Sequence, residues 1–158
     1  MIKIITDSSA YLKKSDSQEM DIKVIPISYT VGNKLCFESF SDANDNFEEL
    51  LKSKLKLATS QPNPTAFFDA FENELSQGNE VICISLSSRL SGTYRSAYMA
   101  AKQTESENIF VFDSQLAAGG LFLLISEAKK LIDKGQSFLQ ITKELPKIRD
   151  RISILNLF

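Results

Sequence analysis

The sequence predicts an α/β fold, a three-layer sandwich in which a mostly parallel sheet carries helices on both faces. Two observations lead to this class. Short apolar runs alternate along the chain with segments of helical periodicity, which is typical of strands joined by crossover helices. The apolar runs at residues 80–86 (EVICISL) and 108–113 (NIFVFD) are nearly continuous, as expected for strands that are covered on both faces.

The other predicted strands lie near the N-terminus. Residues 2–6 (IKIIT) form the first, and residues 23–31 (KVIPISYTV) form one or two more, because Pro26 interrupts the run. Predicted helices cover residues 45–55, 63–78, 94–103, 114–135 and 137–151, the last with a break at Pro146. At the very end, residues 152–158 (ISILNLF) have the apolar content of a strand.

The helix at residues 63–78 has recognisable signals at both ends. Asn63 is a good N-cap, Pro64 suits the first turn, and Gly78 can end the helix. Phe67, Phe71 and Leu75 follow at intervals of four residues and so make one stripe, which predicts packing against a core rather than a ligand wall.

Composition excludes several classes of function. The 158 residues carry a net charge of −2, and the 18 Lys and Arg are dispersed, so a nucleic-acid-binding face is not expected. The chain has no histidine, which removes Ser–His–Asp hydrolysis, Cys–His chemistry and histidine-ligated zinc. Cys36 and Cys83 are far apart, and the acidic residues lack calcium-loop spacing. We therefore expect no metal, no cofactor and no enzyme activity.

The N-terminal apolar run is too short for a signal peptide or a membrane span, so a cytoplasmic protein without an integral membrane segment is expected.

Hydroxyl-rich segments follow several predicted strands: residues 6–10 (TDSSA), 58–64 (ATSQPNP), 87–94 (SSRLSGTY) and 112–117 (FDSQLA). Ligands of open α/β sheets bind beyond the carboxyl ends of the strands, so convergence of these segments would make a donor-rich site for a carboxylate or phosphate. Helix capping and turn formation are the alternative explanation for so many Ser and Thr.

Four segments, in this order, resemble the DegV family of fatty-acid-binding proteins. They are MIKIITDSSAYL, TSQPNP, ISLSSRLSGTYRSAYMAA and VFDSQLAAGGLFLLISEA, and the resemblance covers essentially the whole chain. It implies a bacterial protein that holds one long-chain fatty acid, with its carboxyl group on hydroxyls and its tail in an apolar tunnel, and presents it to a fatty acid kinase for acyl phosphate formation. The positions implied to bind the carboxylate are Thr59, Ser60, Ser91, Gly92 and Thr93.

The chain departs from the family in two substitutions and in length. Asn63 stands where the family usually has serine, and Arg95, which we expect to face solvent, stands where glutamine is common. Residues 1–158 are expected to form a single DegV-like N-terminal α/β domain, without the usual second domain and its tail-binding wall. Two alternatives stay open: a truncated domain that binds no lipid tightly, and a small α/β domain for another anion. Pairing of two copies into a homodimer is also left open.

Overall fold

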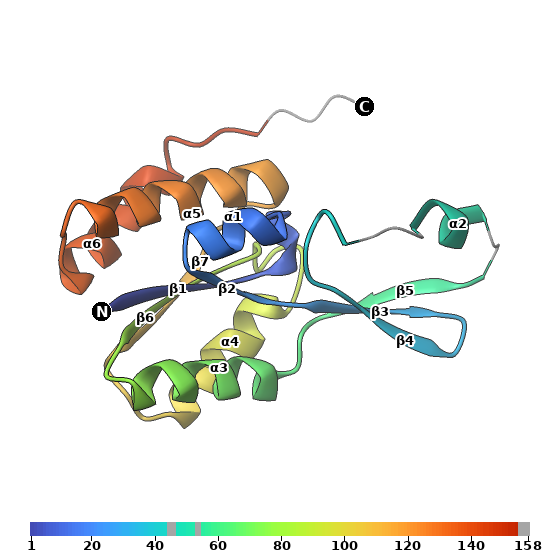
Figure 1. The fold of residues 1–158 in the computed structure, drawn as a ribbon, viewed down its shortest axis with the longest axis horizontal. Coiled ribbons are helices and arrows are strands. Elements are labelled where there is room, and N and C mark those ends of the chain that lie inside the picture. The colour runs from blue at the N-terminus through green and yellow to red at the C-terminus, as the bar shows by residue number, and fades with distance from the viewer. Residues whose placement is uncertain (44–46, 53–54, 155–158) are drawn as a thin grey trace.

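The computed structural model describes residues 1–43, 47–52 and 55–154 and contains two sheets. The main sheet is parallel, in the order β2-β1-β6-β7, and a three-stranded antiparallel ribbon in the order β4-β3-β5 projects from it (Figure 1). The strands of the main sheet are β1 (Ile2–Asp7), β2 (Ile22–Ile25), β6 (Glu80–Ser85) and β7 (Ile109–Asp113). Those of the ribbon are β3 (Ile27–Val31), β4 (Lys34–Glu38) and β5 (Leu57–Ser60).

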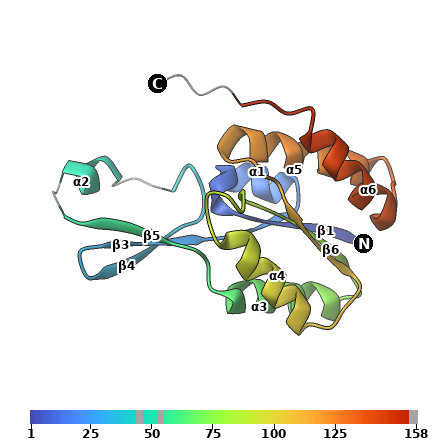
Figure 2. The same ribbon diagram turned by 180° about the vertical axis from the view of Figure 1, so that it is seen from behind.

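Helices cover both faces of the main sheet, which confirms the predicted class. Helices α5 and α6 lie on one face and α3 and α4 on the other (Figures 1 and 2). The helical elements are the short 3-10 helix η1 (Ser8–Ala10), α1 (Lys14–Glu19), α2 (Phe47–Lys52), α3 (Pro64–Ser76), α4 (Thr93–Gln103), α5 (Ala118–Asp133) and α6 (Phe138–Arg149). Within the described residues, no helix has both the length and the apolar character needed to cross a bilayer.

Strand β6 explains why its sequence is apolar at nearly every position. Ile82 and Ile84 point into the core beneath α5 and α6, whereas Val81 and Cys83 point into the core beneath α3 and α4. Successive side chains of a strand alternate between faces, so a strand with a core on each side needs apolar residues throughout. All four side chains are fully buried, and β6 is central in the sheet.

Helix α3 begins and ends where its sequence predicts. The Asn63 side chain accepts a hydrogen bond from the Thr65 backbone N–H (3.0 Å), and Gly78 follows the helix with φ of +73°. Phe67 and Phe71 are fully buried and tilted against each other with ring centroids 6.1 Å apart. The aromatic stripe of this helix therefore serves the core.

The C-terminal region differs from the prediction. Helix α6 runs without a break through Pro146, because Ile141, Leu145 and Ile148 on its buried face hold it against the sheet on both sides of the proline. Residues 152–154 form no strand, and residues 155–158 lie outside the described residues. Of the helix predicted for residues 45–55, the structure describes α2 at Phe47–Lys52 and a non-helical Leu55, and residues 45–46 and 53–54 lie outside the described part.

The ribbon was the main element that the sequence did not predict. Pro26 separates β2 from β3 as expected, and the chain there leaves the parallel sheet to form a hairpin with β4. Gly32, with φ of +59°, supplies the left-handed conformation in the two-residue turn between Val31 and Lys34. Residues 58–60, which the sequence predicts to lie in a loop, instead belong to β5 (Leu57–Ser60) and pair with β3.

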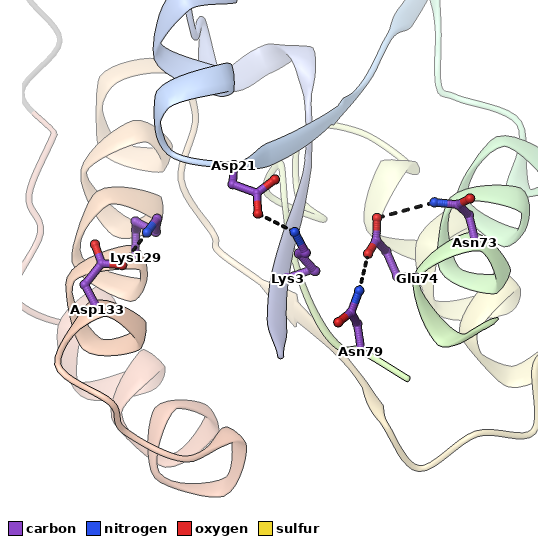
Figure 3. Close-up of polar contacts among 7 residues, drawn as sticks. All are labelled: Lys3, Asp21, Asn73, Glu74, Asn79, Lys129 and Asp133. Carbon is purple, nitrogen blue, oxygen red and sulfur yellow. Dashed lines mark hydrogen bonds and ion pairs between the residues drawn. The ribbon is translucent and has the colours of Figure 1, made fainter. Parts of the chain in front are cut away.

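Polar contacts fasten the opposite, amino-terminal edge of the main sheet (Figure 3). Lys3 of β1 forms an ion pair with Asp21, which lies just before β2. The buried Asn79 donates through Nδ2 to Glu74 Oε2 (2.8 Å) and so ties the end of α3 to the start of β6. These contacts tie β1 to β2 and α3 to β6 at this edge, whereas the hydroxyl-rich loops that follow β1, β6 and β7 lie at the carboxyl ends of the strands.

Candidate functional site

Loops at the carboxyl ends of β1, β6 and β7 are joined by hydrogen bonds that two aspartates accept. Asp7, at the end of β1, accepts the Leu86 backbone N–H through Oδ2 (2.8 Å). Asp113, at the end of β7, accepts the Ser88 backbone N–H through Oδ1 (3.0 Å). The loop that follows β6 is thus held from both sides, which places three of the four hydroxyl-rich segments at one edge of the sheet.

Many of the hydroxyls in these loops are used within the loops themselves. Ser9 donates to Asp7 Oδ1 and Ser88 donates to Asp113 Oδ2, while Ser8 Oγ accepts the Ile27 backbone N–H (3.0 Å). Turn formation therefore explains much of the Ser content. The number of hydroxyls left for a ligand is smaller than the sequence suggested.

Ser91 and Thr93 form a coupled pair at the start of α4. Their hydroxyl oxygens are 2.9 Å apart, and Ser91 Oγ also accepts the Thr93 backbone N–H (3.3 Å). Thr93 is fully buried, whereas Ser91 is partly exposed. When Thr93 donates its hydroxyl hydrogen to Ser91, the hydrogen of Ser91 is free to point outward. Ser91 is therefore the member of this pair that can reach a ligand.

Thr59 and Ser60, the two hydroxyls of β5, lie on opposite faces of the ribbon. Thr59 pairs with Tyr29 in the register of β3 and β5, and Ser60 pairs with Ser28. Since neighbouring residues of a strand point to opposite faces, the two side chains are directed into different environments. No hydrogen bond joins either of them to Ser91, Gly92 or Thr93 in the described part of the chain.

The face of the ribbon that carries Thr59 borders a pocket of about 530 Å³. Its walls are largely apolar and include two tyrosines; the lining residues are Tyr11, Ile27, Tyr29, Glu38, Leu57, Ala58 and Thr59. Burial, and then the neighbouring Cys36 and Glu38, raise the pKa of the Tyr29 phenol, so it stays neutral and able to donate. Glu38 is the one charged residue of this lining, so the described wall offers no cation to an anion.

Gln61 connects the two segments that supply the predicted contacts. It lies two residues after Thr59, and its side-chain Nε2 is 3.3 Å from Ser96 Oγ of α4. Its carboxamide also covers Gly92 so closely that a Cβ there would come within 1.7 Å of Oε1. The segment around Thr59 is in this way fixed to the segment around Ser91.

Asp7 is the most deeply buried carboxyl group at this edge. Burial raises its pKa above the ordinary value, while hydrogen bonds from Ser9 and Leu86 act in the opposite direction. The sequence analysis missed both Asp7 and Gln61 as site-organising residues. An acidic residue directly after an apolar strand and an amide inside the TSQP segment were the available signals.

Arg95 is exposed, in agreement with its predicted orientation toward solvent. Within the described residues, no group of three His, Cys, Asp or Glu side chains is arranged to hold a metal ion. The arrangement can thus offer neutral hydroxyl donors beside an apolar wall.

Comparison with known proteins gives matches over nearly the whole chain. A family model described as uncharacterised protein, DegV family, matches residues 1–157. A DegV domain-containing protein of Clostridium acetobutylicum is 38% identical over 149 residues, which is 91% of this chain and 52% of that protein.

Solved structures show the same similarity. A DegV protein described as a fatty acid binding protein from Bacillus subtilis has a TM-score of 0.82 and 29% identity, covering 94% of this chain and 54% of that one. A stearic acid-binding protein from Eubacterium ventriosum has a TM-score of 0.83 and 27% identity, covering 92% and 52%. The chain thus spans about half the length of the relatives that it matches.

Proposed function

Because this chain belongs to the DegV family, we propose that it binds a long-chain fatty acid, with its tail in the pocket beside β5 and its carboxyl group on Ser and Thr hydroxyls. The observation that supports this most is the pocket of about 530 Å³, which has apolar walls and the Thr59 hydroxyl at its border. Its volume lies within the range of small-molecule sites. Solved relatives described as fatty acid binding proteins support the choice of ligand.

Thr59 and Ser91 are the proposed hydroxyl donors to the carboxylate. Thr59 faces the apolar pocket, and the hydroxyl hydrogen of Ser91 is free for a ligand when Thr93 is the donor in the bond between the two hydroxyls. Gly92 and Thr93 act by holding Ser91 and Gln61 in place, and Ser60 lies on the other face of the ribbon. Each donor to a charged oxygen contributes about 1.5–3 kcal/mol.

The pocket favours a fatty acid over a small hydrophilic anion. A small anion gains little from apolar walls and would find Glu38, an acid, as the charged group of this lining. A fatty acid gains about 0.8 kcal/mol for each CH₂ removed from water. If this chain covers only half of a sixteen-carbon tail, it forgoes about 6 kcal/mol, which weakens the affinity by a factor on the order of 10⁴ relative to full burial.

The binding experiment uses the 158-residue chain after delipidation. Stearic acid is titrated in, and the dissociation constant is measured by isothermal calorimetry and checked by native mass spectrometry. We expect Thr59→Ala and Ser91→Ala each to weaken binding about tenfold or more, because each removes one bond to a charged group. Ser76→Ala, which alters an exposed hydroxyl at the far end of α3, is the matched control.

Two results would count against the proposal. If no fatty acid co-purifies and stearic acid shows no binding below about millimolar, the chain is not a fatty-acid-binding unit by itself. If Ser60→Ala weakens binding and Thr59→Ala does not, the carboxyl group lies on the other face of the ribbon.

The proposed role is that of a cytoplasmic carrier that presents its fatty acid to a fatty acid kinase. The resemblance of the TSQP and LSGT segments to the family supports this role. In the described structure, Ser87 and Ser91 make no side-chain hydrogen bond to a lysine or a carboxylate, and the Ser88 hydroxyl donates to Asp113 Oδ2 within the loop that Asp113 holds. Acyl phosphate formation by a purified bacterial fatty acid kinase, with and without this chain, tests the role; a rate that does not depend on the chain would refute it.

A further inference from the structure

Strand β4 forms an outer edge of the projecting ribbon. It pairs with β3 on one side, and no other described strand pairs with its second side. The ribbon extends away from the helices of the main sheet in both views (Figures 1 and 2). Leu35 and Phe37 of β4 are 56% and 61% exposed. An edge strand with apolar side chains and an open ladder is a ready surface for another strand.

Two copies of β4 that run antiparallel place complementary residues opposite each other. The strand reads Lys34-Leu35-Cys36-Phe37-Glu38. In an antiparallel pair of two such strands centred on Cys36, each lysine lies opposite a glutamate of the other copy. Each exposed leucine likewise lies opposite an exposed phenylalanine. Both kinds of cross-strand pair stabilise antiparallel ladders.

We propose that the outer edge of β4 is a self-association surface on which a second copy of this chain pairs antiparallel, with the two-fold axis passing through Cys36. The two ribbons then form one six-stranded antiparallel sheet, in the order β5-β3-β4 continued by β4-β3-β5 of the second copy. A two-fold arrangement uses the same patch on both subunits, which a self-complementary strand satisfies. This inference is independent of the ligand proposed above.

The charges of β4 select this arrangement over the parallel one. In a parallel pair in register, Lys34 would lie beside Lys34 and Glu38 beside Glu38, so both ends would carry like charges. In the antiparallel pair, each end has one Lys34 opposite one Glu38, and the two-fold symmetry makes these two pairs of opposite charge equivalent. A strand from an unrelated partner would match this pattern only if it carried the same charge order.

Cys36 provides a direct probe of the pairing. Residues that lie opposite each other in an antiparallel ladder have Cα atoms about 4.5–5.5 Å apart, which is within the range that a disulfide can bridge. Cys83, the other cysteine, is fully buried in the core. Diamide oxidation of the native chain should therefore yield a covalent dimer of twice 17.7 kDa, and Cys36→Ser should abolish it.

A charge-exchange experiment separates the proposed geometry from random collision of exposed thiols. Lys34→Glu and Glu38→Lys each place like charges opposite each other in the homodimer. We expect each variant to form the disulfide-linked dimer about fivefold more slowly than the unmodified chain, or to a smaller extent. Mixing the two variants restores both opposite-charge pairs, so the mixed dimer should form preferentially; a purification tag on one variant identifies it. Circular dichroism confirms that both variants are folded.

Sedimentation equilibrium of the unmodified chain gives a result that needs no variant. The apparent mass should rise from 17.7 kDa toward twice that value as the concentration increases, and Phe37→Ser should reduce the rise. A constant monomer mass up to millimolar concentration overturns the proposal. Equal cross-linking of the single variants, the mixture and the unmodified chain overturns it as well.

Discussion

Position 92 requires a glycine because of a neighbouring side chain and not because of its backbone conformation. Its φ of −75° is open to any residue, but the carboxamide of Gln61 occupies the space where a side chain would be. The glycine at the start of α4 is thus matched to a specific residue of the TSQP segment. This match joins two segments that are about 30 residues apart in the chain.

Gly92→Ala tests this match. The new methyl group must displace Gln61 and break its hydrogen bond to Ser96, so the free energy of unfolding should fall by about 0.5–1.5 kcal/mol. In a Gln61→Ala background the space is empty, and the same substitution should cost almost nothing. Urea unfolding of the four proteins in the double-mutant cycle measures the difference. Equal costs in both backgrounds would show that Gln61 does not hold this position in solution.

Asp7 makes stability depend on pH in a direction set by its burial. Its pKa in the folded state is raised, so just above the ordinary value of 3.8 the folded chain retains a proton that the unfolded chain has released. The contribution of Asp7 to the free energy of unfolding therefore falls as the pH rises through this window.

The comparison is with Asp7→Asn, which has no proton to lose. We expect the stability of the unmodified chain, relative to this variant, to decrease between about pH 4 and the raised pKa. Urea unfolding across a pH series gives the slope. A relative stability that increases with pH would mean that the bonds from Ser9 and Leu86 outweigh burial.

At the scale of elements, the two sheets differ in what they bury. Strand β6 is enclosed by helices on both faces, whereas β4 is half exposed at the edge of the ribbon. The two free cysteines lie in these two strands, Cys83 in β6 and Cys36 in β4. Burial raises the pKa of the Cys83 thiol well above its usual range, which removes the reactive thiolate.

Thiol chemistry should distinguish the two strands. In the native protein at low concentration, we expect a thiol reagent such as DTNB to modify one cysteine quickly, Cys36, and to modify Cys83 only after unfolding. Cys36→Ser should leave no rapidly reacting thiol. Fast release of two equivalents from the native chain would indicate that β6 is accessible and would contradict the described core.

At the scale of the molecule, the main sheet separates two cores that share no buried residue, so a packing change in one core is not in direct contact with the other. Ile5 belongs to the core beneath α3 and α4, and Ile125 belongs to the core beneath α5 and α6. Both side chains are fully buried. Substitutions in the two cores should therefore act independently.

Ile5→Val and Ile125→Val are each expected to lower the free energy of unfolding by about 0.5–1.5 kcal/mol. The double variant should equal the sum of the two within about 0.5 kcal/mol, as measured by denaturant unfolding. A larger departure from additivity would show that the sheet transmits packing changes from one core to the other.

The sequence by itself determined the main sheet, the helices on its two faces and the ends of α3. The reason is that strands with two buried faces and capped amphipathic helices carry their pattern within a few consecutive residues. Ile82 and Cys83, for example, lie in different cores, and both must be apolar because both are buried. Tertiary structure alone decided β4, β5 and the pairing of both with β3, because these strands are short and half exposed and β5 pairs with a strand some 30 residues earlier.

The candidate site shows the same division. The sequence indicated Thr59, Ser60 and Ser91 through their motifs, yet the pairing of β5 with β3 determined that Thr59 faces the pocket and Ser60 does not. Likewise, only the packing of the TSQP segment against α4 placed Gln61 over Gly92. Local pattern fixes which residues are polar or apolar, whereas the direction of each side chain depends on contacts between distant segments.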